Sequence, residues 1–426
     1  MIRIDELYDN TFWPWMQENI AGVRLLFCDP PGHTAVENLF SHGYHDPRKE
    51  HEFVFMHDQE PVDYDLYKEL FNEVANRNTD LTTVSWKPIS DDVDITTHPG
   101  CPWPQCKPKP GWYWRGEVAH GGIVVSEKGE YVNRLCREYS WRNYYYFWHG
   151  WAALDWYRGY DRTFLIKRVA DRNPTKTFMS PNRIIGGKRD HRVLFLYEVF
   201  KRNLQHNHIS APRTCPVEHT DITHIASKYQ TQIPDITNIL ATEELPITFV
   251  NEDTQKMSSC WLDNFEAAQD SMFYVPTETV FFGNRLHITE KTFKAIALEM
   301  PFILVAPAHS LQYLRSYGFQ TFGTIIDESY DEEEDDLLRI QKVGKLLEDI
   351  NNLSLSEKQH IWKHCSRIAT HNYTHFYNGN FEKILWKEFI LMLSNIEKDY
   401  HAQILRRQHF ESSDWSIETV SELSNT

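Results

Sequence analysis

The sequence has no long apolar run and little that marks an exported or membrane protein. No stretch of about 18 apolar residues occurs in its 426 residues, and the first fifteen residues contain acids instead of the apolar core of a signal peptide. Seven cysteines, an odd number scattered along the chain, fit reduced thiols better than a disulfide framework. We therefore expect a cytoplasmic protein without membrane insertion.

Basic residues are outnumbered by acids. The chain has 44 Lys and Arg and 60 Asp and Glu, which gives a net charge of -16. This balance argues against a uniformly basic nucleic-acid binder. The charge is uneven, however. Eight acids crowd into "DESYDEEEDD" (327–336), which is typical of a solvated helix start, whereas residues 158–202 hold twelve Lys or Arg against four acids. Anionic ligands are expected at this basic segment.

Standard phosphate and metal motifs are missing as well. The chain has no Walker loop, no Gly-x-Gly-x-x-Gly fingerprint and no CxxC pair. An acidic "DVD" at 92–94 is too short to be specific. Two triplets have spacings that zinc could use but lack a fourth ligand at standard spacing: His98, Cys101 and Cys106, and Cys215, His219 and His224. We expect no bound metal.

What is present is an alternation of strand-like and helical runs, typical of βαβ units around parallel sheets. Strands are expected at 23–28, 52–57, 81–86, 122–127, 176–180, 301–306 and 323–327, and helices at 63–77, 129–139, 190–204, 291–300 and 310–319. The length suggests two domains. We expect an α/β fold of two doubly wound Rossmann-like domains facing a cleft, at 1–170 and 171–405, with C-terminal helices and a polar, mobile tail at 406–426.

The segment "LHITEKTFKAIALEMPFILVAP" (286–307) combines an apolar helix face with a polar start. Its apolar residues Phe293, Ile296, Ala297 and Met300 follow the i, i+3, i+4, i+7 spacing of a core-facing stripe. Thr289 occupies the N-cap position, so the polar residues are explained as an ordinary helix start. Alternatively, the helix N-terminus binds a phosphate, with Lys291 and Lys294 adding charge and Glu290 accepting from ribose hydroxyls.

The stretch "ITEKTFKAIALEMPFILV" resembles the donor-binding segment of GT-B glycosyltransferases, most of all the fucosyltransferase type. Residues 277–336 and the aromatic segment "YYYFWHGWAALDWYRGYD" (144–161) are similar to glycosyltransferase-like proteins of tailed phages. The sequence departs from the fucosyltransferase pattern by having Glu299-Met300 where a small residue precedes the proline. The resemblance implies that Glu290 binds the donor ribose and that Lys291 or Lys294 binds the diphosphate. It also implies the host cytoplasm as the compartment.

Two further loops carry candidate donor-binding residues. Glu278, Asn284 and Arg285 lie upstream of the expected helix and either face the same ligand or form a solvated loop. In "SPNRIIGGKRDHR" (180–192), two adjacent glycines let a backbone approach a phosphate. Arg183, Lys188 and Arg192 could neutralise that phosphate, or the loop is simply a solvated basic one.

Catalytic candidates follow an expected buried strand in "FVFMHDQEPVD" (53–63). Sugar transfer with inversion needs a base for the acceptor hydroxyl, and Asp58 or Glu60 could serve, although an acid at a strand end is often only a helix cap. Ser126, Glu127 and Lys128 lie at the equivalent end of another expected strand. The aromatic run at 141–162 could stack bases or sugars, or belong to a core.

These observations favour a glycosyltransferase of the GT-B type, independent of metal, with no bound cofactor and with a nucleoside diphosphate sugar as co-substrate. The phage resemblance suggests a hydroxymethylated or hydroxylated pyrimidine in DNA as acceptor, and a surface or capsid glycan is the alternative. The rival from another class is a non-catalytic GT-B-like module with a binding or structural role.

Overall fold

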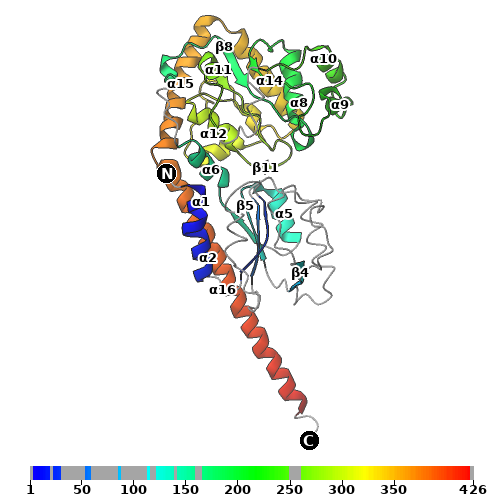
Figure 1. Cartoon of the computed structure of the whole chain (residues 1–426), viewed down its shortest axis with the longest axis vertical. Helices are drawn as coiled ribbons and strands as arrows, with labels where there is room; N and C mark the ends of the chain where they lie inside the picture. The colour runs from blue at the N-terminus through cyan, green and yellow to red at the C-terminus, as the bar shows by residue number, and fades with distance from the viewer. Residues whose placement is uncertain are drawn as a thin grey trace. The chain divides into compact units, whose positions relative to one another are not determined.

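The computed structural model describes the chain in several stretches, residues 3–19, 23–29, 53–58, 85–87, 113–115, 121–138, 142–158, 166–248 and 261–422 (Figure 1). The chain divides into two compact units. The first unit contains Ile2–Trp148 and Trp386–Thr426, and the second contains His149–Leu385 together with Met1. Both boundaries fall inside helices, α6 (Trp148–Trp156) and α16 (Asn380–Glu422). The expected domain limits at 170 and 405 stay predictions.

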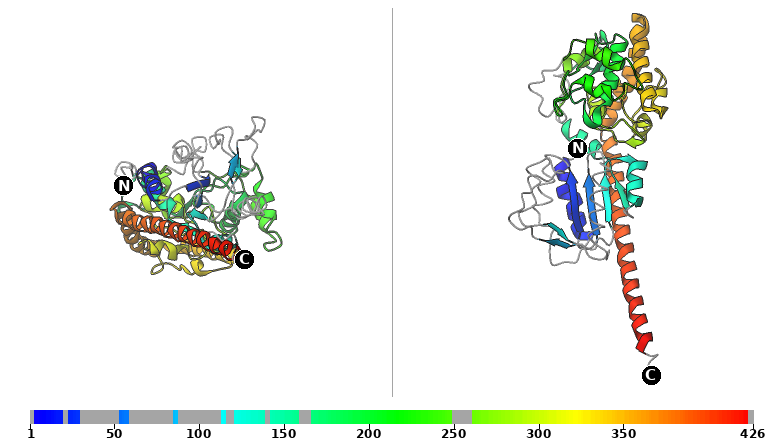
Figure 2. Two further views of the ribbon diagram at one scale, coloured as in Figure 1. Left: turned by 90° about the horizontal axis from the view of Figure 1, so that it is seen from below. Right: turned by 90° about the vertical axis from the view of Figure 1, so that its right-hand side faces the viewer.

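The first unit is built on a parallel sheet of four strands in the order β1-β2-β5-β7 (Figure 2, right). The order follows the chain in one direction, so the described strands of this sheet contain no switch point. Its elements are α1 (Ile4–Leu7), the π-helix η1 (Tyr8–Phe12), α2 (Trp13–Asn19), β1 (Val23–Asp29), β2 (Phe53–Asp58), β3 (Ser85–Lys87), β4 (Tyr113–Arg115), β5 (Gly121–Val125), β6 (Lys128–Gly129), α5 (Glu130–Glu138) and β7 (Arg142–Tyr145).

Helix α16 packs into this first unit through an apolar stripe. Phe389 lies at the centre of the contact, with its ring 6.2 Å from that of Phe12 and 5.5 Å from that of Tyr146. The preceding residue, Glu388, accepts the backbone N–H of Phe147 at 2.7 Å. The helix continues to Glu422, so it includes most of the segment 406–426 that the sequence suggests as a polar tail.

The second unit contains a three-stranded parallel sheet in the order β10-β8-β9. Phe302 and Val305 extend it by isolated parallel bridges to Tyr274 and Thr277. Besides most of α6, its elements are η3 (Val169–Asp171), β8 (Lys176–Ser180), η4 (Gly187–Arg189), α8 (His191–Lys201), β9 (His208–Ile209), α9 (Ile222–Ser227), α10 (Ile236–Thr242), α11 (Phe265–Asp270), β10 (Ser271–Tyr274), β11 (Arg285–Leu286), α12 (Glu290–Ala297), α13 (Ser310–Ser316), η7 (Ser329–Glu332), α14 (Asp336–Asn352) and α15 (Leu355–Tyr377).

The order of this second sheet creates a topological switch point. The chain passes from β8 to β9 on one side and later returns to place β10 on the other side of β8. Ligands of open parallel sheets bind beyond the carboxyl ends of the strands at such a reversal. The segments that leave these two ends are 181–190 and 275–289, which hold most of the residues predicted to bind a donor.

Two of the expected strands are not strands in this unit. Residues 301–306 form only the isolated bridges described above. Residues 323–327 form turns, because the N–H groups of Ile325 and Ile326 both donate to the carbonyl of Phe322. The apolar residues of this second segment are part of a tight reversal and not of a sheet.

The acidic run 327–336 is only partly a solvated helix start. Asp335 has the expected role, since it caps α14 by accepting the N–H of Leu338 at 2.8 Å. Asp331 instead is 5% exposed and accepts the N–H of Leu311 at 3.0 and 3.1 Å, at the start of α13. One acid of the run therefore joins two segments inside the unit.

Asp331 is expected to make stability depend on pH. Burial raises its pKa from 3.8 to about 6, outweighing the hydrogen bonds from the backbone of Leu311 and Gln312. The folded state thus holds this proton more tightly, so the stabilisation is full below about pH 4 and is lost as the pH rises through 6. Urea unfolding between pH 4 and 7 should show this loss in the wild type and not in Asp331→Asn. The exposed Asp327, as Asp327→Asn, is the control. An equal change of the free energy of unfolding with pH in all three proteins would contradict the assignment.

Candidate functional site

Helix α12 begins at the polar cluster that the sequence singled out. Its apolar stripe is buried as predicted, with Phe293 and Ile296 at most 1% exposed. Thr289 is the N-cap residue, but its side chain does not accept a capping hydrogen bond. Its hydroxyl instead donates to Glu278 Oε2 at 2.5 Å. The cap of this helix is therefore supplied by another segment.

Glu278 is that cap. Its carboxylate, fully buried, accepts four hydrogen bonds, from the backbone N–H and the hydroxyl of both Thr289 (3.1 and 2.5 Å) and Thr292 (3.2 and 2.5 Å). A carboxylate at a helix N-terminus is favoured by the helix dipole. Glu278 was a candidate for contacting a ligand, and the structure places it instead as a positioning residue that holds the loop before α12 against the start of the helix.

Glu290 is the first residue of α12 and is only 6% exposed. Burial alone would raise its pKa, but Lys291, His149 and Lys294 outweigh burial and hold the pKa at about 2. The nearest basic groups are Lys291 Nζ at 2.8 Å from Oε1 and His149 Nδ1 at 3.9 Å from Oε2. The site therefore contains a buried carboxylate that stays ionised and can accept hydrogen bonds.

The two lysines of α12 differ in their surroundings. Lys291 is half-buried, and its Nζ donates to the hydroxyls of Thr279 and Thr289 at 3.1 Å each, in addition to Glu290. Lys294 is 6% exposed and lies 3.6 Å from Asp263 Oδ1. Burial lowers the pKa of Lys294 and raises that of Asp263, while each partner opposes the shift of the other. Lys291 is thus the lysine with solvent access at the helix start.

The loop after β8 is tied to the loop after β10 by two residues of α8. Arg192, 5% exposed, donates to the carbonyls of Ile184 at 2.8 Å and Thr277 at 2.9 Å. His191 Nε2 donates to the carbonyl of Glu278 at 3.0 Å. Burial lowers the pKa of Arg192 to about 9, so the guanidinium remains charged at neutral pH. Arg192 was predicted to contact a phosphate, but here it positions the two loops that meet at the switch point.

The glycine pair in the loop after β8 lies against an acid of the chain itself. A Cβ added at Gly186 would lie 2.3 Å from Glu218 Oε2, and one at Gly187 would lie 2.8 Å from Glu218 Oε1. The Cys215 thiol donates to the same carboxylate. The diglycine backbone therefore lies against the Glu218 carboxylate, and its contact with a phosphate stays a prediction.

The remaining predicted donor-binding residues lie at the surface of the second unit. Arg183, Lys188 and Asn284 are exposed, and Arg285 is half-buried in β11. The structure thus brings together Glu278, Thr289, Glu290 and Lys291 at the start of α12. The exposed basic residues belong to the surface of the surrounding loops.

Sequence reasoning did not identify three residues next to Glu290 and Lys294. These are His149 and Asp263, described above, and Tyr157, whose hydroxyl donates to the carbonyl of Glu290 at 3.4 Å. His149 and Tyr157 come from the aromatic segment 144–161, which favours the core alternative because Trp151 is 1% exposed and Tyr157 is fully buried. In the sequence, only the resemblance of that segment to phage proteins pointed to His149 and Tyr157.

The catalytic candidates are not placed by the structure. Asp58 is the last residue of β2, but its side chain lies outside the described residues, and so does the whole of Glu60. Both stay predictions. At the equivalent strand end, Ser126 accepts the N–H of Trp148 at 3.1 Å, and Lys128 lies 3.7 Å from Glu388, so both have structural partners in the first unit.

Metal and membrane features can be checked only in the stretches that the structure describes. There, no three His, Cys, Asp or Glu side chains form a group able to hold a metal ion, including Cys215, His219 and His224. The triplet His98, Cys101 and Cys106 lies outside those stretches. No helix in them is long and apolar enough to span a bilayer. Compared with protein-family models, curated proteins and solved structures, the chain matches none.

Proposed function

We propose that the protein is a glycosyltransferase that moves a sugar from a nucleoside diphosphate donor to an acceptor hydroxyl. The observation that carries this proposal is the pair Glu290 and Lys291, a buried but ionised carboxylate beside a partly exposed ammonium group at a helix start. Helix α12 follows the loop that leaves β10, next to the switch point of the second sheet. That is where open α/β sheets bind nucleotides.

The pair suits the two polar parts of such a donor. Glu290 can accept hydrogen bonds from the ribose hydroxyls, because its carboxylate is ionised. Lys291 can contact the diphosphate by exchanging its hydrogen bond to Thr279, which is among its three present partners. The backbone N–H groups of Glu290 and Lys291 are not among the groups that donate to Glu278. They lie at the positive end of the helix dipole, which would stabilise a leaving diphosphate.

The GT-B resemblance supplies the rest of the proposal. It includes two doubly wound domains facing a cleft, chemistry without a bound metal, and Asp58 or Glu60 as the base that takes the acceptor proton. The parallel sheet and the switch point in the second unit support the donor half. The assignment of Asp58 or Glu60 as the catalytic base rests on the sequence alone.

A panel of nucleotide sugars tests the activity. Hydrolysis should be measured with UDP, GDP, ADP and CMP donors, together with thermal shifts caused by the free nucleotides. We expect release of nucleotide from donors of one base and a matching thermal shift. Silence across the whole panel in both assays would favour the alternative, a non-catalytic GT-B-like module with a binding or structural role.

The proposed acceptor is a hydroxylated or hydroxymethylated pyrimidine in phage DNA. The basic residues of 158–202 that are exposed, such as Arg183 and Lys188, support it, whereas the net charge of -16 favours the alternative acceptor, a surface or capsid glycan. DNA binding through phosphates weakens steeply with salt. Binding of duplex DNA, measured as the salt concentration is raised, decides between the two acceptors. Absence of binding at low salt would exclude DNA and favour the glycan.

Glu218→Gln is expected to strengthen the binding of a nucleoside diphosphate by about 3- to 10-fold, because it removes a negative charge from the diglycine loop. The amide keeps the size of the carboxylate, so the loop should not be disturbed. Isothermal titration calorimetry measures the change. Glu266→Gln, an exposed glutamate of α11, is the matched control. Equal affinity for both variants would show that the diglycine loop does not contact the diphosphate.

A further inference from the structure

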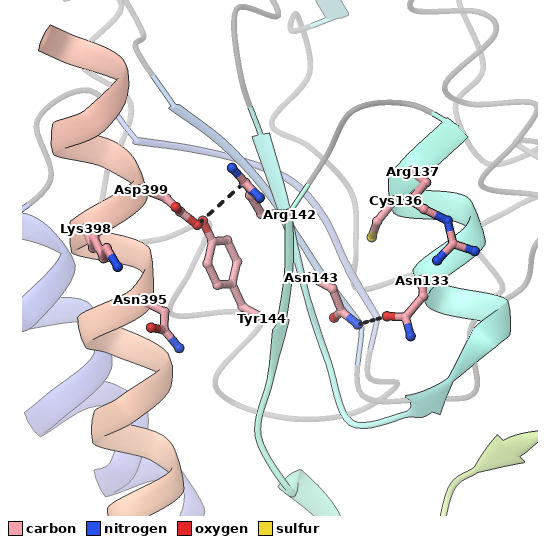
Figure 3. A pocket seen from close by; sticks show the side chains of 9 residues that line it. All are labelled: Asn133, Cys136, Arg137, Arg142, Asn143, Tyr144, Asn395, Lys398 and Asp399. Atoms are coloured by element: carbon pink, nitrogen blue, oxygen red, sulfur yellow. Dashed lines mark hydrogen bonds and ion pairs between the residues drawn. The ribbon is translucent and has the colours of Figure 1, made fainter. Parts of the chain in front are cut away.

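A cavity of about 390 Å³ lies in the first unit, but its polar groups do not converge on one point (Figure 3). Asn143 lies on the α5 side of β7, where its Nδ2 donates to Asn133 Oδ1 at 3.4 Å. Tyr144 lies on the α16 side, where its hydroxyl donates to Asp399 Oδ2 at 2.9 Å. Successive side chains of a strand point to opposite faces, so these groups do not share a ligand. Side chains that can share one lie on α15 of the second unit.

His360 and His364 lie one turn apart on α15. Residues four apart in a helix share a face, and the centroids of these two rings are 4.5 Å apart, with 53° between the ring planes. His360 is exposed and His364 is half-buried. Neither ring makes a hydrogen bond or ion pair with any residue that the structure describes, so both can turn about their side-chain bonds. Two accessible imidazoles are therefore neighbours on one element.

The helix that carries the two rings is firmly held at this end. It begins with a capping box, in which Ser354 Oγ accepts the N–H of Glu357 at 3.3 Å and Glu357 Oε2 accepts the N–H of Ser354 at 2.8 Å. Cys365 and Ser366, which follow His364, are buried and fix the helix against the second unit. A site built on such an element has its ligands positioned before the ligand binds.

The spacing of the rings fits two ligands of one metal ion at right angles. With a metal–nitrogen bond of about 2.0 Å, the centroid of an imidazole lies about 3.2 Å from the metal, so two rings at a right angle have centroids about 4.5 Å apart. Tetrahedral coordination, which zinc prefers, would place the centroids about 5.2 Å apart. The observed 4.5 Å matches the right-angled arrangement. Square-planar or tetragonal nitrogen coordination is typical of Cu²⁺ and Ni²⁺, and Cu²⁺ binds most tightly among the first-row divalent ions.

The charges around the pair favour a neutral imidazole. Desolvation, the ring of His360 and the cations Arg367 and Lys363 all lower the pKa of His364. At neutral pH this ring is therefore uncharged, which is the form whose nitrogen binds metal ions. The same two cations also oppose a bound metal ion. Binding must therefore come from the two imidazoles acting together as a chelate, and not from an attractive charge.

A second histidine pair of α15 has the same spacing but lacks this freedom. The rings of His371 and His375 are nearly parallel, at 2°, and their centroids are 6.3 Å apart. His375 is only 9% exposed, and its Nε2 donates to the carbonyl of Tyr317 at 2.7 Å. Bringing these two rings together would require the buried ring to leave its hydrogen bond. His371 therefore supplies a matched control on the same helix.

We propose that His360 and His364 form a two-histidine site for a divalent transition metal ion, with a preference for Cu²⁺. Each side chain supplies one ring nitrogen, and water fills the remaining positions. The site is compatible with the absence, among the described residues, of any group of three or more metal-binding side chains, because it uses only two. It does not depend on the proposed transferase activity.

Calorimetric titration of the full chain with Cu²⁺, Ni²⁺ and Zn²⁺ tests the proposal. The wild type should have a Cu²⁺ site whose affinity falls by about tenfold or more in His360→Asn and equally in His364→Asn, because either substitution reduces the chelate to a single imidazole. This site should bind Cu²⁺ more tightly than Ni²⁺ or Zn²⁺. His371→Asn removes an exposed histidine of the other pair and should bind Cu²⁺ like the wild type.

A double variant separates a chelate from two independent ligands. His360→Asn combined with His364→Asn should weaken Cu²⁺ binding little more than either substitution alone, because the same chelate is lost only once. Circular dichroism of each variant checks that the helix is retained. Unchanged Cu²⁺ affinity in either single variant, additive losses in the double variant, or an equal loss in His371→Asn would overturn the proposal. Tighter binding of Zn²⁺ than of Cu²⁺ would overturn the preference for Cu²⁺.

Discussion

Glu278→Ala is expected to lower the free energy of unfolding by about 3 kcal/mol, because it removes a fully buried cap. The substitution deletes the acceptor of four hydrogen bonds, so the N–H groups and hydroxyls of Thr289 and Thr292 lose their partner. It also leaves space where the carboxylate was. Urea unfolding followed by circular dichroism measures the change.

The control for this prediction is Glu332→Ala, which removes an exposed glutamate of the second unit. Exposed substitutions of this kind change stability by about 0.5 kcal/mol or less. If Glu278→Ala were as stable as this control, Glu278 would not be the cap of α12, and the expectation that it faces a ligand would gain support.

Glu290→Gln is expected to lower the rate of donor hydrolysis or transfer by about 100-fold or more while the protein remains folded. The amide matches the carboxylate in size but lacks the charge that accepts strongly from ribose hydroxyls and attracts Lys291 and His149. Because the pKa of Glu290 is about 2, the wild-type carboxylate is ionised at every pH above about 4, so the whole effect should be present at neutral pH.

Kinetics with the best donor of the nucleotide-sugar panel, together with a thermal melt of each protein, measure this effect. Some loss of stability is expected, because the variant removes the negative charge that pairs with Lys291. A rate within twofold of the wild type in a folded protein would contradict the role of Glu290. Glu266→Gln again serves as the control for loss of a surface charge in the same unit.

Features set by local sequence were predicted well. The strand 176–180 has the expected limits, and the limits of α5 and α12 lie within one to three residues of those expected, because apolar periodicity marks such elements. Periodicity did not predict that Glu290 and Lys294 of α12 are buried as well. The segment 323–327 shows the limit of this reasoning. Its β-type residues form turns because the Glu328 carboxylate accepts the N–H of Phe322 at 2.6 Å, a contact that residue preferences do not reveal.

The candidate site divides in the same way. Glu290 and Lys291 are neighbours in the sequence, so their proximity could be predicted. The role of Glu278 could not, because its partners Thr289 and Thr292 are brought to it by the path of the loop between β10 and α12. His149 is 141 residues from Glu290 in the sequence, and only the folded second unit places the two side chains together. Predicting a contact between residues this far apart in the sequence requires the order of the strands in the sheet, which the sequence pattern did not reveal.

Glu290 and Lys291 are proposed to hold a nucleoside diphosphate, and calorimetric titration of UDP, GDP, ADP and CDP into the wild type and Glu290→Gln tests this role. We expect at least one of these nucleotides to bind the wild type, and Glu290→Gln to weaken this binding by about tenfold or more. Absence of binding by all four, or equal affinity in the two proteins, would contradict it.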